Sequence, residues 1–409
     1  MGLNSELIES GDLGDLDLVQ LGAASGFLWR SPETTLVGLG PAETVEFGLA
    51  QGGESLTDAL GRMLGDDDVN CPGSGPVGFA ALPFGREVVG VAHVPKIVIG
   101  QTGAKRFVTT PDGVSKADVA RLAQELLLGD IGPVPTSISV LLGLPATRWR
   151  DDVVAAARDH LAASPMRKAV FARQLFLEAD TEFPIRRIIT DLERRFPTAN
   201  LFAIDGFIGA SPELLVSRAD RAVRAHPLAG TARRHVDPAR DAALAEELRG
   251  SIKDRTEHRI TIDWLLAELL PFCSYVDAEP EPTVVSMSNV HHLGTLVEGV
   301  LSAPPASVID LVRAVHPTPA VGGAPQADAI ELIAELEGFD RLRYAGPAGW
   351  VDASGNGEFE VSVRTAQVDG AQATICAGVG LVVQCDPQAE LAETQAKFRA
   401  MLGSFLSPS

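Results

Sequence analysis

Apolar and polar positions alternate along much of the first third of the chain, with the period of two that is typical of β-strands. The pattern predicts strands at residues 34–39, 88–94 and 96–100. Apolar residues at helical spacing predict helices at residues 55–64 and 115–128, which we expect to lie on these strands. Few candidate functional residues fall here, and residues 132–135, Gly-Pro-Val-Pro, form the most linker-like passage.

The remaining residues predict a mixture of strands and helices. We expect strands at 168–176, 199–208, 283–286 and 293–300, a hairpin of 357–368 with 373–383, and helices at 151–163, 185–196, 237–249, 251–270, 308–315 and 386–406. The dipeptides Asp237-Pro238 and Asp386-Pro387 mark two helix starts, because aspartate caps the first turn and proline is favoured at its first position. No internal repeat recurs at a fixed period.

Residues 209–234 predict two short strands, each followed by a loop, and they carry the most suggestive chemistry. Glu213 lies in a Ser-Pro-Glu turn that opens an apolar run, so its carboxyl group is placed where a strand begins. The second loop, residues 228–232, contains Gly230 and Thr231, which offer a backbone N–H and a hydroxyl donor to a ligand. An acid beside such donors is suited to substitution or elimination at an allylic hydroxyl.

Two predicted helices each present a pair of acids three residues apart, Asp254 with Glu257 and Glu390 with Glu393. Side chains at this spacing share one helix face. Two such faces could hold a hard divalent cation that keeps several waters, as Mg²⁺ does. On spacing alone the structural alternative is favoured, since Ser251 and Asp254 fit a capping box and first-turn acids favour the helix dipole.

Three cationic side chains have both a structural and a functional interpretation. Lys168 begins a strand, where it could be a solvated edge residue or a buried amine that takes a proton from water. Arg364 alternates within an apolar strand and could join an ion pair or bind a carboxylate. Lys397 lies one turn beyond Glu393 and could simply pair with it.

Other motifs carry less weight. His292 and His316 have no partner at metal-ligand spacing, and histidines of this kind are more often structural than catalytic. The Ala-Gly-Val-Gly run at 377–380 lies inside a predicted strand and does not open a Rossmann helix, which excludes a dinucleotide-binding loop.

Charge and composition narrow the class of protein. Among 409 residues, 34 Lys and Arg against 54 Asp and Glu give a net charge of −20, which repels nucleic acid and anionic membranes. The apolar runs are too short to span a bilayer, and the acidic start does not resemble a signal peptide. Four scattered cysteines form no zinc or disulfide pattern, so we expect a cytoplasmic protein.

Taken together, these segments resemble the chorismate-utilising enzymes, the family of isochorismate synthase, salicylate synthase and the large subunits of anthranilate and aminodeoxychorismate synthases. The resemblance runs from about Met166 to the C-terminus. It rests on Lys168 before AVFARQ, on residues 331–350, and on the motifs GASPELL, PLAGTARR, KDRTEH, HPTPAVGGAP, GNGEFEVSVRTA, CAGVGLV and ELAETQAKF.

The resemblance implies an α+β fold, in which two packed antiparallel sheets with helices outside form one large unit. Residues 1–145 would be the variable N-terminal half that completes the sheet, and residues 146–409 the chorismate-binding catalytic region. The implied partner is the small molecule chorismate, with no nucleic acid and no membrane, and relatives that use water are often monomers.

The resemblance also assigns roles to residues. It implies Mg²⁺ held by Glu257 and Glu393, with Asp254 and Glu390 acting through water. The implied substrate contacts are Arg364, Lys397, Tyr344, Thr231, His292, Ala320 and the backbone at Gly230 and Gly378. Ile252 replaces an acid that relatives often have before the Lys-Asp pair, and it lies outside the implied ligand set.

Within this family, a lysine at position 168 marks the members that activate water, whereas amine-transferring members lack it. The implied reaction is attack of water on C2 of chorismate, with Lys168 as base and protonated Glu213 as acid to the departing C4 hydroxyl. The sequence HPTPA, ending at Ala320, is similar to isochorismate synthase; the alternative is salicylate synthase, which also eliminates pyruvate. A third hypothesis is a non-catalytic chorismate-binding protein. Isochorismate could feed menaquinone, a catechol siderophore or salicylate.

Overall fold

A long antiparallel pair of strands organises the fold. A computed structural model describes residues 2–9, 11–48, 55–85, 89–287 and 290–406. Strands β3 (Thr34–Gly48) and β6 (Val89–Thr102) pair antiparallel along most of their length, with one irregularity between Leu39 and Ala42. The strand expected at 88–94 therefore continues to residue 102, and its first residue, Val88, lies outside the described residues.

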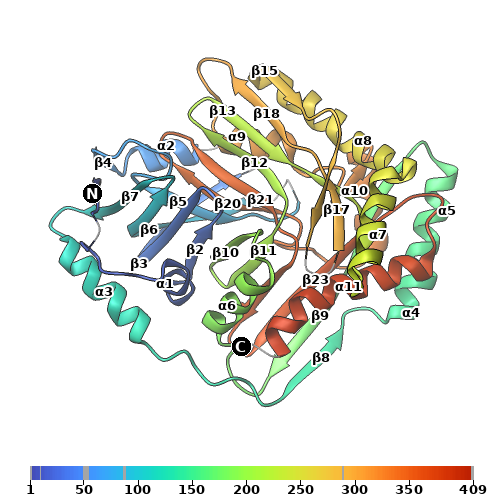
Figure 1. Cartoon of the computed structure of the whole chain (residues 1–409), viewed down its shortest axis with the longest axis horizontal. Helices are drawn as coiled ribbons and strands as arrows, with labels where there is room; N and C mark the ends of the chain where they lie inside the picture. The colour runs from blue at the N-terminus through green and yellow to red at the C-terminus, as the bar shows by residue number, and fades with distance from the viewer. Residues whose placement is uncertain (1, 10, 49–54, 86–88, 288–289, 407–409) are drawn as a thin grey trace.

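Two antiparallel layers extend from this pair of strands (Figure 1). The first continues from β3 through β2 (Phe27–Arg30), β10 (Asn200–Ile204), β11 (Phe207–Ser211), β22 (Thr365–Asp369), β23 (Gln372–Leu381), β9 (Lys168–Ala179) and β8 (Ile138–Leu142). The second continues from β6 through β5 (Val77–Ala81), β20 (Pro347–Asp352), β21 (Gly357–Val361), β12 (Leu214–Ala219), β13 (Ala222–His226), β18 (Val297–Leu301) and β15 (Cys273–Ala278). Both layers join strands from the two ends of the chain.

Shorter strands complete this network and form a second sheet. Strand β6 also pairs with β7 (Lys105–Pro111), which pairs with β1 (Leu3–Leu7), and β1 runs parallel to β4 (Leu64–Asp67). The two-residue β19 (Gly323–Ala324) pairs with the start of β9. A separate sheet contains β14 (Leu228–Arg233), β17 (Val290–Gly294) and β16 (Thr283–Ser286) in that order.

The two layers pack face to face through large aromatic side chains. Trp29 and Phe202 of the first layer and Phe79 and Trp350 of the second belong to one buried cluster. The indole Nε1 of Trp29 donates to Oε2 of Glu358, at 2.6 Å, which joins the layers with a polar contact. Burial of such side chains supplies most of the stabilisation of a fold like this one, at about 25 cal/mol for each Å² of apolar surface.

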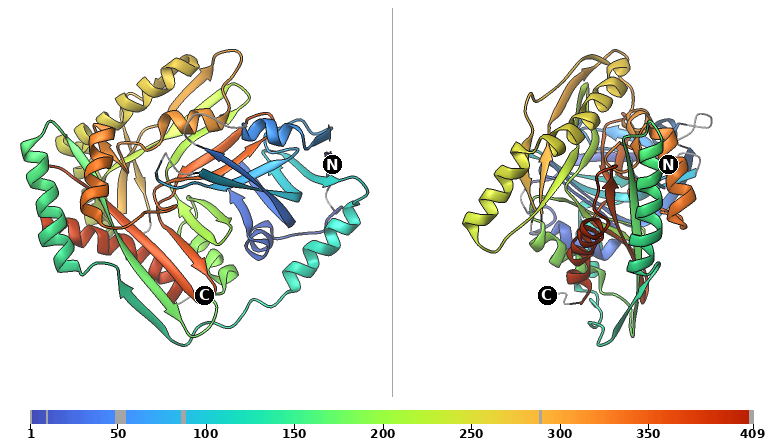
Figure 2. Two further views of the ribbon diagram at one scale, coloured as in Figure 1. Left: turned by 180° about the vertical axis from the view of Figure 1, so that it is seen from behind. Right: turned by 90° about the vertical axis from the view of Figure 1, so that its right-hand side faces the viewer.

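Helices cover the outer faces, as Figures 1 and 2 show. Those against the first layer are α1 (Leu18–Ser25), α3 (Lys116–Leu128), α6 (Ile185–Arg195) and α11 (Pro387–Leu406). Those against the second are α2 (Leu56–Gly61), α8 (Ile252–Leu269) and α9 (Val308–Val315), and α8 ends in the short turn η2 (Leu270–Phe272). The segment α4 (Ala146–Arg148), η1 (Trp149–Val154) and α5 (Ala155–Ala163) packs with α10 (Gln326–Glu337) near β9, and α7 (Pro238–Gly250) packs on β14. The α+β class predicted from the sequence is therefore confirmed.

Several predicted strands are divided in the structure. Residues 199–208 form the hairpin β10–β11, because Asp205 and Gly206 adopt positive φ angles of 52° and 71° and turn the chain. Residues 293–300 belong to two strands, since β17 ends at Gly294 and β18 begins at Val297. Helices α1 and α10 were not anticipated. None of the helices in the described ranges is long and apolar enough to cross a membrane.

Candidate active site

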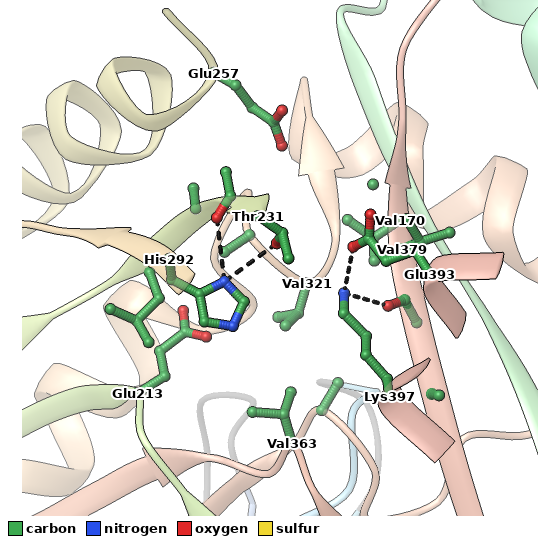
Figure 3. Close-up of a pocket in the computed structure, with 18 of the residues that line it drawn as sticks. Val170, Glu213, Thr231, Glu257, His292, Val321, Val363, Val379, Glu393 and Lys397 are labelled. Carbon is green, nitrogen blue, oxygen red and sulfur yellow. Dashed lines mark hydrogen bonds and ion pairs between the residues drawn. The ribbon is translucent and has the colours of Figure 1, made fainter. Parts of the chain in front are cut away.

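One cavity of about 190 Å³ lies where β9, β23, β14 and the helices α8 and α11 approach one another. Every residue that the sequence singled out for catalysis, substrate or metal binding lines it: Lys168, Glu213, Gly230, Thr231, Asp254, Glu257, His292, Ala320, Tyr344, Arg364, Gly378, Glu390, Glu393 and Lys397. Figure 3 shows Glu213 and His292 on one wall and Lys397 with Glu393 on the opposite wall. The structure thus gathers residues that are up to 229 positions apart, from Lys168 to Lys397.

Lys168 enters the cavity from the first residue of β9 and is buried, with 4% of its surface exposed. The edge-lysine interpretation is therefore wrong. Strand β19 holds the backbone of Lys168 through Ala324, and the Nζ atom lies 2.6 Å from Oε1 of Glu257. Burial alone would raise the pKa of Glu257, but the charge and hydrogen bond of Lys168 outweigh it and lower the pKa below its usual value.

Glu213 lies between β11 and β12 on a rigid backbone. The Ser211 hydroxyl accepts from the Glu213 N–H at 3.2 Å, and the Glu213 carbonyl accepts from Val361 N–H at 3.0 Å. Burial raises the pKa of Glu213 to about 7, against the opposing effects of the Leu228 N–H and of Lys168 and Arg364. Its buried Oε1 has no hydrogen-bond partner among the described residues, so a proton-bearing carboxyl is available to a ligand.

Residues 228–232 are a strand in the structure, which corrects the predicted glycine loop. They form β14, paired with β17, and the ladder shifts register between Ala229 and Thr231. Gly230 occupies this bulge with a φ of 76°, a conformation that glycine adopts without strain. A Cβ atom at Gly230 would lie 3.1 Å from Cβ of Asp254, so the bulge also lets α8 approach.

Arg364 is not part of a continuous strand, contrary to the sequence interpretation. It lies between β21 and β22 with a φ of 55°, and this break turns its side chain into the cavity. Nη2 of Arg364 donates to Nε2 of His292 at 3.0 Å. Burial lowers the pKa of Arg364 to about 10, which leaves the guanidinium charged at neutral pH.

Lys397 on α11 and Tyr344 in the loop between α10 and β20 both approach Gly378 of β23. The Nζ atom of Lys397 lies 2.9 Å from Oε1 of Glu393 and donates to the Gly378 carbonyl at 2.8 Å, so the i,i+4 pair expected as one alternative is present. A Cβ at Gly378 would lie 3.0 Å from the Tyr344 hydroxyl. Burial raises the pKa of Tyr344, which therefore stays protonated as a donor.

The four acids fit a hard cation by their chemistry, although they do not yet converge on one point. Among the described residues, no three acidic, histidine or cysteine side chains form a ready metal-binding group. The Ser251 hydroxyl accepts from the Asp254 N–H at 3.2 Å, as the capping alternative predicted, and it also donates to the Asp254 carboxylate. Yet burial, and then the charge of Glu393, raises the pKa of Glu390 to about 7, which shows negative charge crowded where a cation would relieve it. Oxygen donors on two helices suit Mg²⁺, which needs only one or two carboxylates and keeps its waters.

The cavity contains further residues that the sequence did not single out. Lys253 is one of them. It lies four residues before Glu257, and this spacing in the sequence indicated that the two side chains share a helix face. Gly380 lies beside the proposed base, since a Cβ there would be 2.5 Å from Cε of Lys168. The valines at 170, 321, 363 and 379 supply apolar surface for a ring.

The chain belongs to the chorismate-binding enzyme family, whose model matches residues 17–406. A Mycobacterium tuberculosis protein provisionally named isochorismate synthase MenF is 37% identical over 345 residues, which cover 81% of this chain and 86% of that protein. Isochorismate synthase MenF of Bacillus subtilis is 29% identical over 419 residues, covering 92% of this chain and 87% of that protein.

A solved structure shares the fold over almost the whole chain. The menaquinone-specific isochorismate synthase MenF from Escherichia coli superposes with a TM-score of 0.81 at 24% identity, covering 99% of this chain and 95% of that one. At this identity the likeness concerns the fold alone. It places the two layers and the outer helices in the architecture of the family.

Proposed function

We propose that this protein is an isochorismate synthase, which adds water at C2 of chorismate and releases the C4 hydroxyl. The observation that carries the proposal is the position of Lys168 and Glu213, a buried amine and a buried carboxyl with a pKa of about 7, in one cavity. Acid and base chemistry at neutral pH requires two groups whose environments hold opposite protonation states. The names of the relatives agree with this reaction.

In this mechanism, Lys168 in its neutral form takes a proton from water as the water oxygen bonds to C2. The ring double bonds shift, and Glu213 gives its proton to the oxygen that leaves C4. Lys168 is held by Glu257 at 2.6 Å, so it acts as base only after this ion pair opens. The reaction consumes one water and releases one, and the two side chains exchange no atoms with the ring other than protons.

The substrate carboxylates would be bound by cations that already line the cavity. Arg364 offers several N–H groups in a planar fork, which is suited to bidentate binding of a carboxylate. Tyr344, Thr231 and Lys397 would add donors, and the apolar valines would pack on the ring faces. These donors would favour a dianion over a neutral ring.

We assign the proposed Mg²⁺ to Glu257 and Glu393, with Asp254 and Glu390 acting through waters. Bound there, the metal would neutralise the ring carboxylate and orient the ring. The support is the donor set of four carboxylates on α8 and α11, together with the raised pKa of Glu390. The residues themselves contribute the oxygen ligands and the charge crowding that favours a cation.

The setting that fits this enzyme is the cytoplasm of a cell that makes menaquinone or a siderophore from isochorismate. The four cysteines are free thiols in the structure, which agrees with a reducing compartment. We propose a monomer as the working form. The reaction itself needs no second copy, because every proposed catalytic and binding residue comes from one chain.

Product analysis tests the proposal. The purified protein is incubated with chorismate and Mg²⁺, once in plain buffer and once with ammonium ions, and the products are separated by liquid chromatography. The proposal predicts isochorismate in both incubations. Salicylate with pyruvate would identify a salicylate synthase, anthranilate in the ammonium sample would identify an amine-transferring enzyme, and unchanged chorismate would indicate a protein that only binds it.

A further inference from the structure

Both ring nitrogens of His292 are already engaged within the protein. Nε2 lies 3.0 Å from Nη2 of Arg364, and Nδ1 lies 3.1 Å from the carbonyl oxygen of Gly230 and 3.1 Å from Oγ1 of Thr231. A guanidinium can only donate, so Nε2 must accept. A carbonyl can only accept, so Nδ1 carries the proton. The ring is therefore a neutral tautomer with a fixed direction.

The surroundings of the ring keep it neutral. His292 is buried on β17, opposite Thr231 in the β14–β17 ladder. Burial, and then the positive charges of Arg364 and Lys397, lower the pKa of His292 well below its usual value. A second proton on Nε2 would point at the guanidinium, so His292 has neither a proton nor a free lone pair to offer a ligand.

Arg364 depends on this contact for its orientation. The residue lies in the break between β21 and β22, where no strand ladder fixes the direction of its side chain. Among the described residues, His292 is the hydrogen-bond partner of the Arg364 guanidinium. One of the five N–H groups is used in this bond, which leaves enough donors for a bidentate carboxylate.

We propose that His292 is a positioning residue that aims Arg364 at a substrate carboxylate and does not itself contact the substrate. This inference rests on the proposed function and deepens it. It assigns the binding of a substrate carboxylate to Arg364 and the orientation of Arg364 to His292. The ring is anchored in turn by the bulge at Gly230, which abuts Asp254 on α8. The ring N–H of His292 donates to Oγ1 of Thr231. The Thr231 hydroxyl can therefore donate its own proton into the cavity.

Two amide substitutions separate the two contacts of the ring. The amide of His292→Gln reaches the position of Nε2, so its oxygen can accept from Arg364. The amide of His292→Asn reaches only the position of Nδ1, so it can donate to Gly230 but leaves Arg364 without its acceptor. The proposal predicts a KM for chorismate within about threefold of wild type in His292→Gln. In His292→Asn the KM rises about ten- to hundredfold while kcat changes less, as for loss of a hydrogen bond to a charged group.

A double-mutant cycle with Arg364→Ala completes the test. If His292 acts through Arg364, His292→Asn adds less than about a twofold change in KM when Arg364 is already absent. Equal KM values for the Gln and Asn variants, or a full additional loss in the Arg364→Ala background, would overturn the proposal. So would the loss of a limb from the pH profile in His292→Gln, because it would place the ring among the reacting groups.

The same variants remain informative if the proposed reaction is wrong. Whatever product the wild-type enzyme forms, KM is read from the disappearance of chorismate. If no turnover occurs, equilibrium binding of chorismate is measured by calorimetry for the same variants, with the same ordering expected. Failure of the isochorismate assignment therefore appears in the product, whereas failure of the positioning role appears in the order of the affinities.

Discussion

The Nζ atom of Lys168 lies 2.6 Å from Oε1 of Glu257, so the proposed base and a proposed metal ligand form one buried ion pair. The pair brings together the first residue of β9 and the second turn of α8. In the proposed mechanism, Lys168 takes a proton from water only after this pair opens. We therefore expect metal binding to affect the base, because Mg²⁺ would compete with Lys168 for the Glu257 carboxylate.

Removing the amine should abolish turnover. In Lys168→Gln we expect kcat to fall about 10²- to 10⁴-fold, the usual contribution of a general base. The measurement is the initial rate of isochorismate formation, with circular dichroism to confirm folding. The matched control is Arg167→Gln, which changes the exposed neighbouring residue and should leave the rate unchanged. A Lys168→Gln rate within about threefold of wild type would remove the lysine from the mechanism.

A methyl group at Gly380 should disturb the base without unfolding the protein. The added Cβ would lie 2.5 Å from Cε of Lys168, whose flexible end can move aside. In Gly380→Ala we expect a melting temperature close to wild type and at least about a tenfold loss of kcat, since small displacements of a catalytic group are costly. The control is Gly61→Ala, where a Cβ meets nothing within 4 Å. Full activity in Gly380→Ala would show that the position of Lys168 is not critical.

Glu213 should make the free energy of unfolding fall as the pH rises, although this side chain supports catalysis. Its folded pKa of about 7 lies above the ordinary value of 4.5, so the folded state holds the proton more tightly than the unfolded chain. The stability associated with this proton is complete below pH 4.5 and is lost as pH rises through 7. Glu213→Gln should therefore gain roughly 2.5 kcal/mol relative to wild type between pH 5 and pH 8.

Urea denaturation at the two pH values measures this difference, and the same variant should have lost its turnover. The comparison at pH 5, where both side chains are neutral, is the internal control. If the free energies of unfolding of variant and wild type differ by the same amount at both pH values, Glu213 does not carry a raised pKa. Wild-type turnover in Glu213→Gln would independently end its assignment as the acid.

Neutralising the helix acids should weaken dependence on Mg²⁺. We expect Glu257→Gln and Glu393→Gln to need at least about tenfold more Mg²⁺ for half-maximal rate, within the range seen when metal-site side chains are altered. Because the pKa of Glu390 is about 7, wild-type affinity for Mg²⁺ should rise between pH 6 and pH 8, and Glu390→Gln should flatten this rise. Glu246→Gln on the exposed face of α7 is the control. Unchanged Mg²⁺ titrations in all three variants would place the metal elsewhere.

The residues of the cavity could be predicted from local patterns and resemblance, but their mutual geometry could not. The i,i+3 acids mark one face of α8 or α11, yet nothing local shows that Glu257 meets Lys168 across the fold. The alternation around Arg364 looked continuous, because a positive φ in a non-glycine residue leaves no trace in an apolar pattern. Gly230 suggested a loop, whereas the structure uses its positive φ for a bulge within β14.

Other differences between the predicted and the observed elements had a visible signal in the sequence. Asp205-Gly206 is a dipeptide that favours tight hairpin turns, and it divides the strand predicted at 199–208. The face-to-face packing of the layers follows from contacts such as Trp29 with Glu358, which are separated by 329 residues and cannot be read from sequence periodicity. Local structure was therefore accessible from the chain, whereas long-range pairing required the fold.

Isotope labelling tests the central claim, which is that Lys168 activates water for attack at C2 while Glu213 releases the C4 hydroxyl as water. The enzyme is run with chorismate and Mg²⁺ in H₂¹⁸O, and the isolated isochorismate is analysed by mass spectrometry and ¹³C NMR. The account predicts one ¹⁸O atom per product molecule, bonded to C2. Unlabelled isochorismate, which would mean that the C4 oxygen is retained within the molecule, would contradict it.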